Sequence, residues 1–190
     1  MIWHEHSEIP KEYHAPFPAS SYSWLNYDDE KAVKYYISLM AKKRGTRLHA
    51  FAAEAIDLGV QLKVGKGNET LAHYVNDSIK FGLRPEQRLF YSWNFTGTAD
   101  AIIFDERKNV LRVFDLKTGA IPAKLDQLLI YDALFCLEYR VDPNDIMHDV
   151  RIYQNNDVLS DTPTGEMIQP IMDRIVHFDQ LIRDYQEELE

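Results

Sequence analysis

The sequence predicts an α/β fold in which a central β-sheet is flanked by helices. Two apolar runs, 99–104 and 110–116, are separated by a short polar segment, and this pattern is typical of a β-hairpin. Segments with helical periodicity lie on both sides of the hairpin. At 190 residues the chain is long enough for a substantial core, and we expect a single domain over 1–190.

The chain before the hairpin is predicted to be mainly helical. Residues 1–19 contain three prolines and no clear periodicity, so we expect an irregular N-terminal arm there. One helix is expected over 28–43 and another over 46–58, with Gly45 as the break between them.

Further helices and strands follow on both sides of the hairpin. Asn68 is expected to cap a third helix that runs to about Phe81 and is followed by Gly82. The other predicted segments are a strand over 86–94, a helix over 123–138, a strand over 148–154, a polar loop over 155–165 and a final helix over about 168–189.

Three charged residues interrupt the hairpin, although an unpaired charge in a buried strand is costly. Asp115 and Lys117 are two residues apart and therefore share a face of their strand. In a register whose paired residue numbers add to about 215, Asp100 lies opposite Asp115, with Cβ atoms roughly 5 Å apart. Two carboxylates that close repel each other unless a cation lies between them, and hard oxygen ligands favour Mg²⁺ or Mn²⁺. Lys117 would then stabilise developing negative charge beside the metal.

Four short motifs occur in order between residues 45 and 131. They are Gly45-Thr-Arg-Leu-His49, Gly97-Thr-Ala-Asp100, Asp115-Leu-Lys117-Thr-Gly119 and Gln127-x-x-x-Tyr131. Together they resemble the PD-(D/E)xK nuclease superfamily, in particular its RecB/Cas4-like branch. The resemblance implies a restriction-endonuclease-like core with a central mixed sheet, of which 45–131 is the motif-bearing part.

The resemblance also implies roles for individual residues. Lys117, Asp100 and Asp115 would be catalytic. The expected metal ligands are His49, Asp100, Asp115 and the backbone carbonyl of Leu116, with Mg²⁺ or Mn²⁺ as the cofactor. Glu86 is a secondary candidate, because similar nucleases often carry an acidic residue on the preceding strand. Gln127 and Tyr131, one helical turn apart, are assigned to substrate binding.

The net charge of −9, taken alone, argues against a nucleic-acid partner, but the charge is unevenly distributed. Residues 31–131 contain 16 Lys and Arg against 10 Asp and Glu, whereas the rest of the chain contains 5 against 20. The motif-bearing segment is therefore locally basic, which suits a phosphate backbone. Lys43, Arg44 and Arg47 are the candidate DNA-binding side chains, and the alternative is an ordinary solvated surface.

These observations predict a Mg²⁺- or Mn²⁺-dependent deoxyribonuclease that acts in DNA processing, recombination, or phage and defence systems. An exonuclease is the preferred form, and an endonuclease remains open. The alternative is a catalytically inactive nuclease-fold module that binds DNA or assists a larger complex, and a third interpretation is a hydrolase of another phosphate ester. A protein partner from a DNA-processing complex fits the first two interpretations.

The composition also sets limits. Cys136 is the single cysteine, so the chain has no intrachain disulfide and cannot supply the four-cysteine iron–sulfur cluster of many Cas4-like proteins. No apolar run approaches the roughly 20 residues of a membrane span, and the N-terminus lacks the pattern of a signal peptide. We therefore expect a cytoplasmic protein without an iron–sulfur cluster and without a membrane partner.

Overall fold

The computed structural model describes residues 15–119 and 121–188, and the chain divides into two compact units, 1–44 and 45–190. In the first unit, the 3₁₀ helix η1 (Tyr22–Asn26) precedes the beginning of the long helix α1 (Asp29–Asp57). Of the expected irregular arm, residues 1–14 lie outside the described residues, and 15–19 form bends and turns as predicted. The single domain expected over 1–190 stays a prediction.

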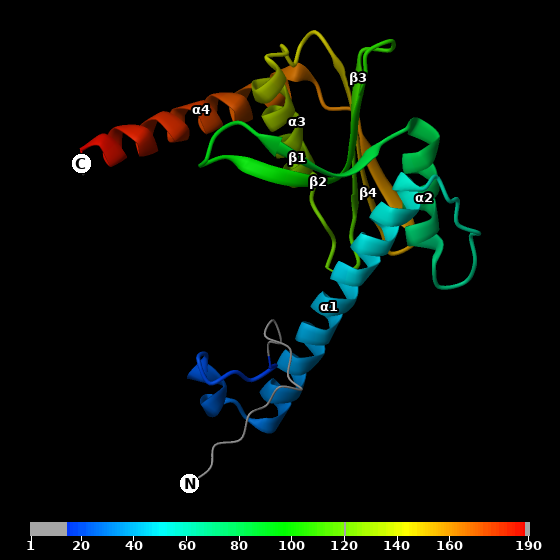
Figure 1. Ribbon diagram of the computed structural model, residues 1–190, viewed down its shortest axis with the longest axis vertical. Coiled ribbons are helices and arrows are strands. Elements are labelled where there is room, and N and C mark those ends of the chain that lie inside the picture. The colour runs from blue at the N-terminus through cyan, green and yellow to red at the C-terminus, as the bar shows by residue number, and fades with distance from the viewer. Residues whose placement is uncertain (1–14, 120, 189–190) are drawn as a thin grey trace, which may run out of the picture. The chain divides into compact units, whose positions relative to one another are not determined.

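The second unit is built on a five-stranded mixed sheet with the strand order β1-β2-β3-β4-β5 (Figure 1). The strands are β1 (Arg84–Phe90), β2 (Thr96–Asp105), β3 (Val110–Leu116), β4 (Met147–Gln154) and β5 (Asp157–Asp161). All neighbouring pairs are antiparallel except β3 and β4, which are parallel. Helix α3 (Asp126–Tyr139) lies in the crossover that a parallel pair requires.

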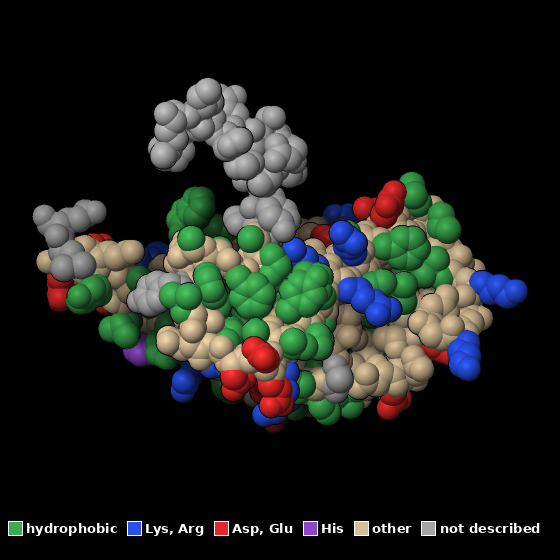
Figure 2. Space-filling model, turned by 90° about the horizontal axis from the view of Figure 1, so that it is seen from below, with side chains coloured by type: hydrophobic (Ala, Val, Ile, Leu, Met, Phe, Trp, Pro, Cys, Tyr) green, Lys and Arg blue, Asp and Glu red, His purple; other side chains and the backbone are tan. Residues whose placement is uncertain are grey.

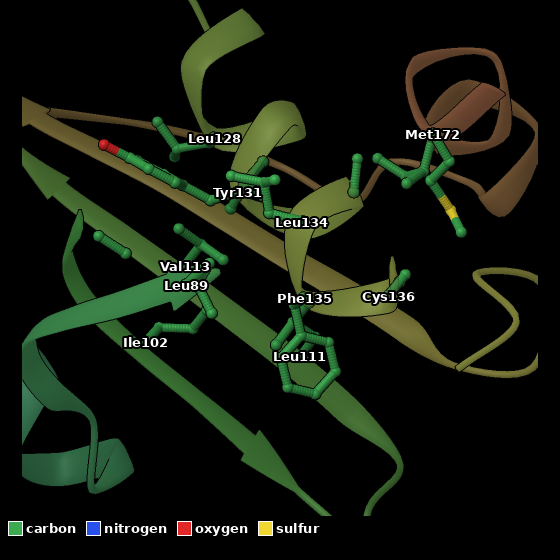
Figure 3. Close-up of a cluster of buried hydrophobic side chains, with 14 of the residues drawn as sticks. Leu89, Ile102, Leu111, Val113, Leu128, Tyr131, Leu134, Phe135, Cys136 and Met172 are labelled. Atoms are coloured by element: carbon green, nitrogen blue, oxygen red, sulfur yellow. The ribbon is translucent and has the colours of Figure 1, made fainter. Parts of the chain in front are cut away.

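Helices cover both faces of this sheet. Helix α2 (Glu69–Phe81) and the last turns of α1 bury one face, where Ala52 and Tyr74 belong to the same apolar cluster as Phe114. Helix α3 and helix α4 (Gly165–Glu187) cover the other face, and Figure 3 shows the side chains that fill this layer. Because β3 is covered on both sides, it is buried along its whole length. The predicted α/β fold with a central mixed sheet flanked by helices is confirmed.

The prediction that Gly45 breaks the helix is wrong. Helix α1 runs without interruption from Asp29 to Asp57, and Gly45 is buried within it. A Cβ atom at this position would lie 2.8 Å from Oγ1 of Thr118, on the segment that follows β3. The glycine therefore allows a close approach of two segments, which sequence alone does not distinguish from a helix end.

The prediction of a continuous loop over 155–165 is also wrong, because this segment contains β5. Every residue of β5 is exposed, so the strand lacks the apolar alternation by which strands are recognised. The turn before it is a two-residue connection formed by Asn155 and Asn156, whose φ angles are 52° and 62°. Asparagine tolerates positive φ, and this dipeptide is the signal that predicts the hairpin.

The remaining elements agree with the sequence to within a few residues. Helix α2 follows Asn68 and ends at Gly82, whose φ of 72° is the left-handed conformation expected after a helix. The side chain of Asn68 accepts a hydrogen bond from the Gly65 N–H and does not cap the helix. Cys136 is buried, and burial raises the pKa of its thiol to about 12.

The surface carries both signs of charge. The face drawn in Figure 2 carries basic, acidic and hydrophobic side chains. Among the described residues, no helix combines the length and apolar character that a membrane span requires.

Candidate metal centre

Asp100 and Asp115 lie opposite each other on β2 and β3. The neighbouring pair is Ala101 with Phe114, which is the register predicted from the sequence. Asp100 is half-buried, and its Oδ2 accepts a hydrogen bond of 2.9 Å from the backbone N–H of Leu116. Asp115 is only 2 % exposed, and its Oδ2 is buried with no hydrogen-bond partner among the described residues. Asp100 is thus held by a backbone hydrogen bond, whereas Asp115 has a buried oxygen without a hydrogen bond to the described residues.

Glu86 and His49 extend this pair to the other side of Asp100. The β1–β2 pairs on either side of Glu86 are in register, so Glu86 occupies the position on β1 opposite Asp100. From helix α1, His49 places its Nδ1 3.2 Å from Asp100 Oδ2. One ligand atom from each of His49, Glu86 and Asp100 lies within 4.8 Å of the other two. These three groups form the compact cluster, and Asp115, opposite Asp100 on β3, lies beside it without belonging to it.

The backbone of Glu86 is unusual for a residue within a strand. Its φ is 49°, in the left-handed region that few residues other than glycine adopt. Such a conformation costs on the order of 1 kcal/mol or more, and residues of this kind are concentrated at functional sites. Sequence reasoning gave Glu86 a secondary place, and its position opposite Asp100 now makes it a full member of the cluster.

The cluster carries more negative charge than its cations balance. Burial raises the pKa of Asp115, the charge of Asp100 raises it further, and Lys117 opposes both effects. Burial and Asp100 likewise raise the pKa of Glu86. The hydrogen bond to Asp100 raises the pKa of His49, against the effect of burial, and the other carboxylates add to the rise. Surplus carboxylate charge raises the pKa of neighbouring carboxyl groups, because like charges repel, and raises the pKa of a histidine, because its positive form is attracted.

Lys117 is held at the edge of this cluster by two acceptors. Its Nζ lies 3.0 Å from Asp115 Oδ1 and 2.9 Å from Gln127 Oε1. The Gln127 amide donates in turn to the hydroxyl of Tyr131, at 2.9 Å. The helical spacing of Gln127 and Tyr131 on α3 thus places both beside the end of β3, and a continuous chain of hydrogen bonds fixes the ammonium group.

Gly97 provides the room for this chain of contacts. A Cβ atom at Gly97 would lie 2.8 Å from Cε1 of Tyr131 and 3.6 Å from Cδ1 of Leu134. This packing role of Gly97 was not predicted from the sequence, where the glycine appears only as part of a motif. The signal was present, because a glycine inside a strand often marks a close approach by another segment.

For the remaining predicted site residues, the structure gives a position but no contact that tests the predicted role. Leu116 contributes its backbone N–H to Asp100, and the ligand role of its carbonyl stays a prediction. Lys43 and Arg44 are exposed on the part of α1 that belongs to the first unit. Arg47 is exposed on the part of α1 that belongs to the second unit, two residues before His49. Their role in DNA binding also stays a prediction.

The donor set suits a hard divalent cation. Carboxylate oxygens are the ligands that Mg²⁺ and Mn²⁺ prefer, and an imidazole nitrogen is compatible with Mn²⁺. The buried Oδ2 of Asp115, which has no hydrogen-bond partner within the described ranges, is the kind of atom that a cation would satisfy. The residues therefore fit a Mg²⁺ or Mn²⁺ site.

No protein-family model matches the chain, and no match is found among curated proteins or among solved structures. The class that the fold and the site define is an α/β protein with a candidate divalent-metal centre.

Proposed function

We propose that the protein is a Mg²⁺- or Mn²⁺-dependent deoxyribonuclease of the PD-(D/E)xK type. The observation that carries the proposal is the row of Glu86, Asp100 and Asp115 across three strands, with His49 on one side. Lys117 stands at the other side, fixed by hydrogen bonds. The four motifs that resemble this superfamily supply every residue of this arrangement except Glu86.

Each group in the cluster has a distinct part in the proposed reaction. The carboxylates and His49 would hold the cation, which supplies a bound water of lowered pKa and neutralises phosphate charge. Lys117 presents its ammonium group beside Asp115, where it stabilises negative charge that develops on the phosphate. Gln127 keeps the ammonium in place, and Tyr131 keeps Gln127 in place. Pre-organised charge of this kind contributes to rate because no rearrangement is needed during the reaction.

The test is digestion of end-labelled linear DNA by the purified protein with Mn²⁺. We expect cleavage by the wild type and its loss in Asp115→Ala. In Lys117→Ala the rate should fall by about 10²–10³, which is the effect of removing one pre-organised electrostatic group. Lys66→Ala, which changes an exposed lysine outside the cluster, is the matched control and should cleave normally.

Cleavage that survives both site substitutions would show that the assignment is wrong. Mn²⁺ binding by a wild type that cleaves no DNA would favour the alternative, a nuclease-fold module that assists a larger complex.

A further inference from the structure

One face of the ribbon formed by β1 and β2 is open to solvent next to the candidate metal centre. Along β1, Arg84, Glu86, Arg88 and Phe90 are exposed, whereas Gln87 is half-buried and Leu89 is buried. Arg88 and Phe90 are two residues apart and point to the same side, opposite to Leu89, so they form a line that leads away from Glu86 of the metal centre.

Strand β2 continues the same open face. Thr98 pairs with Arg88, and Thr96 pairs with Phe90, and both threonines are exposed. The residues between them point the other way, as Gly97 shows by its close approach to Tyr131 of α3. Helix α3 therefore covers one side of the ribbon, and the side with Arg88 and Phe90 is free of it.

Trp93 stands at the far end of this line and is 93 % exposed. Its ring packs edge-on against Phe90, with centroids 5.4 Å apart. The loop that carries it is tied down, because Ser92 Oγ donates to the buried carboxylate of Asp179 at 2.6 Å and the Asn94 amide donates to the same oxygen at 3.0 Å. The loop thus displays a large aromatic side chain to solvent in a fixed position.

The charge of this segment is also distinctive. Residues 87–99 contain no Asp or Glu, although the protein carries 30 acidic residues in 190. Arg88 is the basic residue of the segment, and it takes part in no ion pair within the described part of the chain. An exposed guanidinium without a carboxylate partner is available to a phosphate group.

We propose that Arg88, Phe90 and Trp93 form a track for a single strand of DNA that leads to the metal centre. The proposal rests on the proposed nuclease function and names its substrate as single-stranded. Alternate strand residues are about 6.6 Å apart, comparable with the repeat of an extended nucleic-acid strand. Arg88 contacts the backbone, and Trp93 stacks on an unpaired base, as aromatic groups do in single-strand binding proteins. A duplex does not offer this contact, because its bases are already stacked on one another.

The test measures binding apart from cleavage. Fluorescein-labelled (dT)₂₀ and a blunt 20-base-pair duplex are titrated with protein in Ca²⁺, without Mg²⁺ or Mn²⁺, and followed by anisotropy. We expect Trp93→Ala to weaken (dT)₂₀ binding about tenfold and to change duplex binding much less. Arg88→Ala should reduce the slope of log K against log salt for (dT)₂₀ by about 0.7. Tyr139→Ala removes an exposed aromatic ring from α3 and should leave both affinities unchanged.

Three results would overturn the track. They are wild-type affinity of Trp93→Ala for (dT)₂₀, an equal loss of affinity for the duplex, and failure of the wild type to bind (dT)₂₀. Digestion of linear single-stranded and duplex DNA with Mn²⁺ separates this proposal from the nuclease function. If the wild type digests DNA but Trp93→Ala binds (dT)₂₀ as tightly as the wild type does, the nuclease function stands and the track is wrong. If the wild type binds (dT)₂₀, Trp93→Ala weakens this binding, and the wild type cleaves no DNA, the track stands and the nuclease function is wrong.

Discussion

Replacing Gly97 with alanine should destabilise the protein and disturb the site at the same time. The added methyl group would meet Cε1 of Tyr131 at 2.8 Å and Cδ1 of Leu134 at 3.6 Å. The Tyr131 ring cannot easily move away, because it is 9 % exposed and its hydroxyl accepts a hydrogen bond from Gln127. Overpacking of this kind costs about 1–3 kcal/mol, whereas alanine in a strand gains about 0.5–1 kcal/mol over glycine. We expect a net loss of about 1–2 kcal/mol in the free energy of unfolding.

Urea unfolding followed by circular dichroism measures this loss, and a double-mutant cycle identifies its cause. Tyr131→Leu removes the ring atoms that the new methyl group would meet. Gly97→Ala should therefore cost less than half as much in the Tyr131→Leu background as in the wild type. An equal cost in both backgrounds, or a gain in stability from Gly97→Ala alone, would refute the packing argument.

Two further predictions concern buried charge. Asp115→Asn should raise the free energy of unfolding of the metal-free protein by about 1 kcal/mol, since it removes a desolvated charge beside Asp100. Urea unfolding in EDTA measures this change, and a loss of stability would contradict the prediction. The second concerns His148, whose ring nitrogens face the Asp132 carboxylate at 3.1 Å and the Pro143 carbonyl at 3.0 Å in the buried interior. Burial alone would lower the pKa of His148, but these two hydrogen bonds outweigh it and the pKa is raised. Its contribution to stability is therefore complete below the ordinary histidine pKa of about 6.5 and is lost as pH rises through the raised value. Asp132→Asn should weaken the fall in stability above pH 6. A parallel pH profile in wild type and variant would disprove this role.

The sequence predicted those parts of the fold that local patterns determine. Closing the short loop between the two apolar runs with paired residue numbers that add to about 215 places Asp100 opposite Asp115, and the structure has this register. The roles of Gly45 and Gly97 did not follow, because each depends on a side chain that is distant in sequence and close in the fold. Strand β5 was missed because no apolar pattern marks an exposed edge strand.

The residues of the candidate site could be proposed from the sequence, but the hydrogen bonds between them could not. Motif spacing identified His49, Lys117 and Gln127, but the hydrogen bond from Lys117 to Gln127 requires the packing of α3 beside β3. Glu86 was uncertain from sequence, since its contribution depends on the pairing of β1 with β2 and on an unusual backbone conformation.

The central claim is that the carboxylate row and His49 bind a divalent cation, and a calorimetric titration of the purified protein with Mn²⁺ tests it most directly. We predict saturable binding to the wild type and a loss of affinity of at least about tenfold in Asp100→Asn, because Asp100 lies at the centre of the row. Glu54→Gln, an exposed acidic residue on the same helix as His49, should bind Mn²⁺ like the wild type. Absence of Mn²⁺ binding, or equal affinity in Asp100→Asn and the wild type, would contradict the account.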